Sequence, residues 1–99
     1  MKNREEILEF LRQNKGELYR KYRLSRMGLF GSMARGEGKR ESDVDILIEF
    51  ADNSGDLFTL KRELREFLTR TFGRPVDLAR EKYLRPYARE AIFRDLIDV

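Results

Sequence analysis

The sequence GSMARGEGKRESDVDILIEF, residues 31–50, joins a basic loop broken by glycines to an apolar run that carries two aspartates. Side chains two positions apart share one face of a strand, so the run predicts a strand over residues 43–50. One face of this strand holds the apolar side chains of Val44, Ile46, Ile48 and Phe50. Asp43 and Asp45 fall on the other face, about 7 Å apart at their Cα atoms, where like charges repel each other. A solvated outer face explains a lone D-x-D, so any function of these carboxylates depends on the rest of the chain.

Helices and further strands are predicted around this strand. Residues 4–22 follow Asn3, a helix-capping residue type, and their near-helical apolar spacing predicts one amphipathic helix. Residues 57–72 repeat apolar side chains every three or four positions and stop at Gly73, which predicts a second helix. The remaining predicted elements are strands over residues 26–30 and 75–79, a turn over residues 51–56 and a helix over residues 87–96.

The composition leaves carboxylates to do any acid–base or metal chemistry. The chain has 99 residues, enough for a single small domain over residues 1–99. It has no cysteine and no histidine, which excludes thiolate and imidazole metal sites and imidazole bases. The net charge of +3 is too small to argue for nucleic acid. No segment has the pattern of a signal sequence or a membrane span, which predicts a cytoplasmic protein without membrane contact.

Asp77 adds a third candidate carboxylate, because it lies between Val76 and Leu78 in another predicted strand. If the two strands are neighbours, Asp43, Asp45 and Asp77 converge on one face, where their repulsion needs a cation to balance it. Hard oxygen ligands of this kind suit Mg²⁺ or Mn²⁺. Two such ions held by shared carboxylates support in-line phosphoryl or nucleotidyl displacement.

The glycine loop fits neither of two common phosphate-binding motifs. A Walker A loop needs lysine where Glu37 stands, and a dinucleotide fingerprint needs a third glycine where Glu41 stands. The remaining interpretation is a strand that ends at Gly31 and Ser32 and passes into one helical turn, whose exposed N–H groups favour an anion. Arg35, at the end of that turn, is a suitable charge partner for a triphosphate.

Each loop residue also has an ordinary structural interpretation. Ser32 is a common helix-capping type, and Gly36 is a common turn glycine. Arg35 can be a surface charge, and Ser42 can either act as a cap or begin the following strand. The loop alone therefore leaves the phosphate site open.

The segment GSMARGEGKRESDVD, residues 31–45, resembles the G-S-x-A-R-G…S-D-x-D signature of the DNA polymerase β-like nucleotidyltransferase superfamily. It is particularly similar to the minimal nucleotidyltransferases, the antitoxin family that pairs with HEPN-domain toxins. With the later aspartate in PVDLA, the likeness covers almost the whole chain. The resemblance implies an α+β fold, a small mixed β-sheet with helices packed on one face, and this agrees with the predicted order of helices and strands.

The same resemblance assigns roles to individual residues. It implies that Asp43 and Asp45 bind two Mg²⁺ ions, with Mn²⁺ as a substitute. It implies that Asp77 completes the catalytic metal site and helps to deprotonate an acceptor hydroxyl. The residues implied to bind the nucleotide are Gly31, Ser32, Arg35 and Ser42, with Gly31 and Ser32 cradling the triphosphate.

The activity implied is transfer of AMP from ATP to a tyrosine hydroxyl of a HEPN ribonuclease toxin, which neutralises the toxin within a hetero-oligomer. The chain is too short for a further domain that reads a primer, so direct nucleic-acid binding is not expected. A non-catalytic antitoxin that acts by binding alone is the alternative. A small RNA-binding domain is a third interpretation, based on KRELREFLTRTFGRP and RKYRLSR, but solvated helix faces explain these basic runs better.

Overall fold

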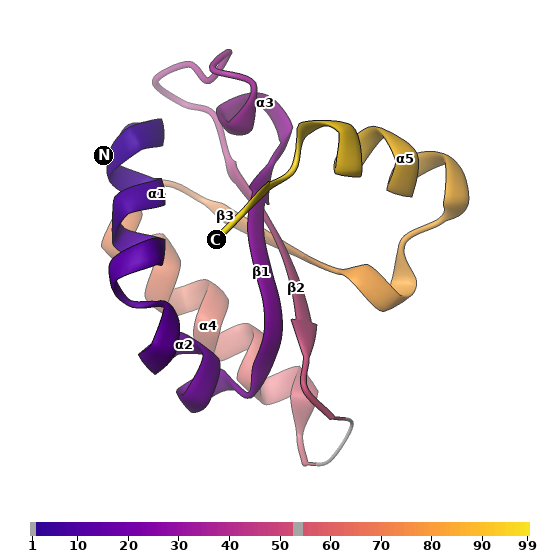
Figure 1. Cartoon of the computed structure of the whole chain (residues 1–99). Coiled ribbons are helices and arrows are strands. Elements are labelled where there is room, and N and C mark those ends of the chain that lie inside the picture. Colours follow the sequence, from indigo (N-terminus) through magenta and orange to yellow (C-terminus); the bar gives the residue numbers. More distant parts are fainter. Residues whose placement is uncertain (1, 53–54) are drawn as a thin grey trace.

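The computed structural model describes residues 2–52 and 55–99, in which helices and strands are interspersed (Figure 1). The helices are α1 (Arg4–Gln13), α2 (Lys15–Tyr22), α3 (Gly31–Ala34), α4 (Leu57–Phe72) and α5 (Pro86–Asp95). The strands are β1 (Leu24–Phe30), β2 (Val44–Phe50), β3 (Val76–Arg80) and β4 (Ile97–Asp98), and η1 (Glu81–Tyr83) is a short 3₁₀ helix. The predicted turn over residues 51–56 contains positions 53 and 54, which lie outside the described residues. In the part of the chain that is described, no helix is long and apolar enough to cross a bilayer.

The strands form one mixed sheet in the order β3-β2-β1-β4. β1 pairs antiparallel with both β2 and β4, whereas β2 and β3 run parallel. Parallel neighbours need a crossover connection, and α4 supplies it between β2 and β3. The parallel register places Val44 beside Val76 and Asp45 beside Asp77. The predicted α+β class with a mixed sheet is therefore confirmed.

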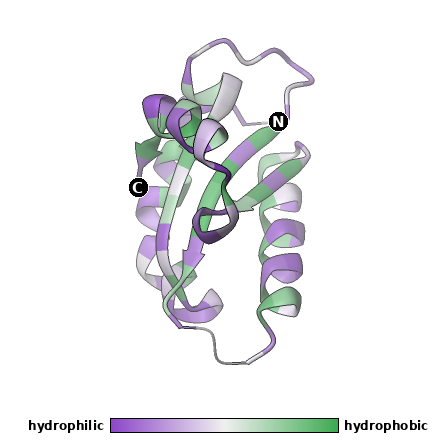
Figure 2. Cartoon of the chain, turned by 90° about the vertical axis from the view of Figure 1, so that its right-hand side faces the viewer, coloured by the Kyte–Doolittle hydropathy of each residue, from purple (hydrophilic) through white to green (hydrophobic). Residues whose placement is uncertain are grey.

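The core lies between the sheet and helices α1, α2 and α4, which cover one face of the strands in Figure 1. The alternation along β2 produces this arrangement, because Val44, Ile46 and Ile48 face the helices and have no exposed surface. Figure 2 shows the strands largely in green, the hydrophobic colour, with purple hydrophilic bands between. The predicted apolar face of β2 and the helices packed on it are confirmed.

Helix α5 lies apart from these helices, on the other side of the strands in Figure 1, and none of its residues is buried. Arg35 Nη1 donates to Asp95 Oδ2 of α5 at 2.8 Å. The guanidinium carbon of Arg26, on β1, lies 4.7 Å from the centre of the Phe93 ring of α5. These contacts tie α5 to β1 and to the segment that follows α3.

The prediction of one helix over residues 4–22 is wrong, because Asn14 separates α1 from α2. The Asn14 side-chain amide donates to Phe10 O at 2.9 Å, and asparagine favours helix ends because it competes for main-chain groups in this way. Other boundaries also differ from the prediction: β1 begins at Leu24, and Asp43 precedes β2 instead of starting it. β4 and η1 are absent from the prediction.

Candidate active site

Asp45 and Asp77 lie side by side on β2 and β3, on the sheet face opposite the core. Asp45 is partly buried, whereas Asp77 and the preceding loop residue Asp43 are exposed. Burial raises the pKa of Asp45 above its usual value, and the charges of Asp77 and Asp43 raise it further. The structure therefore brings Asp45 and Asp77 together, and the charge of Asp43 also acts at Asp45.

Gly31 brings the glycine loop against Asp45. Its φ is +76°, in the left-handed region that residues with side chains disfavour. A Cβ atom at this position would overlap Oδ2 of Asp45. Glycine is therefore required for two reasons where the chain turns from β1 into α3 beside the carboxylate.

Ser32 lies at the second position of α3 and is half-buried. The residue at the cap position is Phe30, so the interpretation of Ser32 as a helix cap is wrong. The Ser32 carbonyl accepts from Glu37 N–H at 2.9 Å, which closes the loop behind the helix. Gly36 has a φ of +76° with open space where a Cβ would stand, which fits a turn glycine.

Arg35 is close enough to the site for its charge to lower the pKa of Asp45, against the larger effects of burial and the neighbouring carboxylates. Its donors are engaged by two other acidic side chains. Nη1 donates to Asp95 Oδ2 at 2.8 Å, and Nε donates to Glu37 Oε2 at 3.1 Å. The structure thus places the positive charge near Asp45 while the guanidinium hydrogen bonds point to α5 and the loop.

Ser42 closes a turn in the loop that leads to β2. Its Oγ accepts from Lys39 N–H at 2.7 Å, and its own N–H donates to Lys39 O at 3.0 Å, which fits the capping interpretation. No sequence pattern singles out Arg74, yet its buried guanidinium donates to Ser42 O at 3.1 Å. The one sequence feature that could have drawn attention to Arg74 is its position between Gly73, which ends a helix, and the strand that carries Asp77.

The carboxylates fit a divalent cation by charge and by donor type. Within residues 2–52 and 55–99, no group of three or more acidic side chains is gathered closely enough to hold an ion. Asp45 and Asp77 nevertheless present oxygen ligands from adjacent strands. Burial is the main cause of the raised pKa of Asp45, and a bound cation would offset the smaller contribution from the charges of Asp77 and Asp43. Oxygen donors are the set that Mg²⁺ and Mn²⁺ prefer.

Asp45→Asn is expected to stabilise the metal-free protein at neutral pH. A pKa raised in the folded state means that the ionised carboxyl lowers stability, and asparagine removes that charge. The stability that protonated Asp45 contributes is complete below the ordinary aspartate pKa of 3.8 and is lost as pH rises through the higher pKa of the folded state. Urea unfolding in EDTA should therefore give Asp45→Asn a higher free energy of unfolding than wild type at neutral pH. The difference between the two proteins should shrink as the pH is lowered. If the difference in free energy of unfolding were the same at neutral and acid pH, the stabilisation would come from packing and not from removal of the charge.

Added Mg²⁺ should make wild type more stable than Asp45→Asn. A ligand present at about one hundred times its Kd stabilises the folded state by about 2.7 kcal/mol. Wild type should gain this stability, while Asp45→Asn should gain less because one proposed ligand is missing. Equal thermal shifts in the two proteins would contradict a metal site at Asp45.

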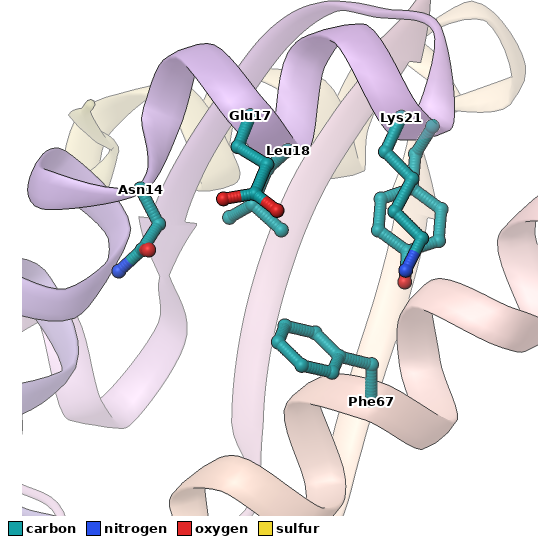
Figure 3. Close-up of a pocket in the computed structure, with 6 residues that line it drawn as sticks. Asn14, Glu17, Leu18, Lys21 and Phe67 are labelled. Atoms are coloured by element: carbon teal, nitrogen blue, oxygen red, sulfur yellow. The ribbon is translucent and has the colours of Figure 1, made fainter.

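A hollow between α2 and α4 lies on the core side of the sheet, away from the carboxylates (Figure 3). It is lined by Asn14, Glu17, Leu18, Lys21, Tyr22 and Phe67. Its volume is about 90 Å³, whereas pockets for small-molecule ligands measure about 300 Å³ or more. This hollow is therefore too small for a nucleotide.

A mixed sheet that presents paired carboxylates beside a glycine loop is suited to nucleotidyl transfer. The chain belongs to the nucleotidyltransferase domain family, whose model matches residues 4–99. It is 44% identical over 100 residues to MJ1379 of Methanocaldococcus jannaschii, which is provisionally named a protein adenylyltransferase. That match covers 100% of both chains.

Two solved structures share the fold. One, provisionally described as a minimal nucleotidyltransferase, has a TM-score of 0.73 and 32% identity, over 93% of this chain and 95% of that chain. The other is a tri-AMPylated HEPN toxin of Shewanella oneidensis in complex with an MNT antitoxin. Its TM-score is 0.63 at 20% identity, over 91% of this chain and 69% of the matched chain. The predicted membership of the minimal nucleotidyltransferases is confirmed, and with it the enzyme class.

Proposed function

We propose that this chain transfers AMP from ATP to a tyrosine hydroxyl of a HEPN ribonuclease toxin and so acts as its antitoxin. The observation that carries the proposal is the pairing of Asp45 with Asp77 beside Gly31. The choice of a protein acceptor is supported by the adenylyltransferase name of the Methanocaldococcus relative, and the choice of toxin by the AMPylated HEPN complex. The proposal includes a cytoplasmic hetero-oligomer as the working form.

In this proposal Asp43 and Asp45 hold two Mg²⁺ ions, or Mn²⁺ in their place, and Asp77 completes the set from the neighbouring strand. Such ions, when bound, stabilise negative charge on the attacking and leaving oxygens. Gly31 lets the main chain of the loop approach the triphosphate, and Ser32 stands next to it in α3.

Asp77 is the residue proposed to take the proton of the acceptor hydroxyl. It is exposed on β3, so a side chain of another protein can reach it. The hydroxyl oxygen forms a bond to the α-phosphorus of ATP, while the bond from that phosphorus to the bridging oxygen breaks. Pyrophosphate leaves with the electron pair, and the proton passes to the Asp77 carboxylate.

Arg35 and Ser42 complete the proposed nucleotide-binding set with less direct roles. The charge of Arg35 already acts at Asp45, so it offers a positive field for the triphosphate. Ser42 closes the turn that leads into Asp43. Its contribution is therefore to fix the loop between the phosphate segment and the carboxylates.

The test is incubation of the chain with its HEPN partner, Mg²⁺ and ATP labelled on the α-phosphate. The expected result is label on the partner, abolished by EDTA and by substitution of the acceptor tyrosine with phenylalanine. ATP labelled on the γ-phosphate should give no labelled partner, because that phosphate leaves in pyrophosphate. Tight association without label would instead support an antitoxin that acts by binding alone.

A further inference from the structure

Arg74 is the one polar or charged side chain that is buried in the described chain, with 9% of its surface exposed. No acidic side chain in that part of the structure forms an ion pair with it. Main-chain carbonyl oxygens accept its protons instead. Nε donates to Lys2 O at 2.9 Å, and Nη1 donates to Lys39 O at 2.9 Å, Arg40 O at 2.7 Å and Ser42 O at 3.1 Å.

These bonds join the two segments that carry the exposed aspartates. The turn over residues 39–42 is followed directly by Asp43, and Arg74 itself stands three positions before Asp77. Between them, Pro75 O accepts from Val44 N–H at 2.9 Å, where β2 and β3 begin to pair. One side chain therefore ties the approach to Asp43 to the approach to Asp77.

A space-filling role alone explains this arrangement poorly. Burial of a cation that forms no ion pair is unfavourable, and the turn that Arg74 enters carries the cations Lys39 and Arg40 as well as one carboxylate, Glu41. An apolar side chain would fill the space without that cost. A guanidinium, however, has donors fixed in a planar fork, so Nε and Nη1 can reach Lys2 and the turn simultaneously.

We propose that Arg74 is a positioning residue for the carboxylate site. By holding the turn over residues 39–42 against the start of β3, it sets where Asp43 and Asp77 stand relative to each other. Arg74 touches neither the nucleotide nor the acceptor and acts only through these two aspartates. The inference rests on the proposed function, because it concerns the metal ions that Asp43 and Asp77 are proposed to share.

The test compares Arg74→Lys with wild type by Mn²⁺ titration calorimetry in the presence of an ATP analogue that cannot react at the α-phosphate. Lysine keeps the charge but loses the fork, so it cannot hold Lys2 and the turn simultaneously. The half-saturating Mn²⁺ concentration is expected to rise about 10- to 100-fold, as it does when groups that orient metal ligands are lost. Arg65→Lys, on the exposed surface of α4, is the matched control and should leave Mn²⁺ affinity unchanged.

The outcomes separate this inference from the proposed function. Absence of Mn²⁺ binding by wild type with the analogue would overturn the proposed function itself. Wild-type binding with unchanged affinity in Arg74→Lys, even if its melting temperature falls, would overturn the positioning role alone. Arg74→Met, which fills similar space without charge, is the second variant. If neither variant folds, as judged by circular dichroism, Arg74 serves the fold and the positioning role is also overturned.

Discussion

Asp77→Asn is expected to abolish transfer while the fold and the complex with the partner survive. Asparagine keeps the shape of the side chain but cannot take the proton of the acceptor hydroxyl. Loss of a positioned general base lowers the rate by about 10² to 10⁴, and loss of a metal ligand adds to this. The fold should survive because Asp77 is exposed, and its charge is one cause of the raised pKa of Asp45.

This prediction needs transfer and association to be measured on the same Asp77→Asn sample. Label transfer from ATP labelled on the α-phosphate reports chemistry, and co-purification with the partner reports association. Glu66→Gln, an exposed carboxyl-to-amide change on α4, is the matched control and should behave as wild type in both assays. Retained transfer would remove Asp77 from the catalytic set. Lost transfer with full neutralisation of the toxin would favour the antitoxin that acts by binding alone.

Gly31→Ala is expected to cause the second largest loss of activity, and Gly36→Ala is its matched control. Both glycines have a φ of +76°, so both substitutions carry the backbone cost of the left-handed region, about 1–2 kcal/mol. At Gly36 the new methyl group meets open space, whereas at Gly31 it meets the carboxylate of Asp45. The difference between the two variants therefore isolates contact with the site from backbone strain.

Transfer by Gly31→Ala should fall about 100-fold or more, because displacement of a reacting group by about 1 Å has an effect of this size. Gly36→Ala should lose stability alone, with transfer near wild type. Steady-state transfer rates and urea unfolding of the two variants provide the comparison. If the two variants lose activity equally, the close approach of Gly31 to Asp45 has no role in the reaction.

The central strand and the long helix could be predicted from the sequence because their signals are local. The two-residue alternation around Asp45 fixes which side chains of β2 enter the core, whatever the strand pairs with. The three- and four-residue spacing in α4 ends at Gly73, whose φ of +68° suits the left-handed helix end. The bracketing of Asp77 by apolar residues likewise indicates a strand, although only the structure shows its register with β2.

The contacts that no sequence pattern predicts link residues far apart in the chain. The hydrogen bond from Arg35 to Asp95 joins residues 60 positions apart, and the hydrogen bond from Arg74 to Lys2 joins residues 72 positions apart. No periodic pattern encodes such pairs, since each requires both segments to be placed first. The helix break at Asn14 is a different case: its signal is local, but apolar spacing continues across it and hides the side-chain bond that ends α1.

The placement of the aspartates on the face opposite the core has a consequence for laboratory selection. Asp45 is proposed for catalysis, yet its ionised form works against the metal-free fold. A library screened for heat resistance in a chelating buffer should therefore enrich substitutions at Asp45, and the survivors would be robust but inactive. Engineering a more heat-stable catalyst from this chain requires that Asp45 and Asp77 be held constant, or that every round of screening be performed with Mg²⁺ and nucleotide present.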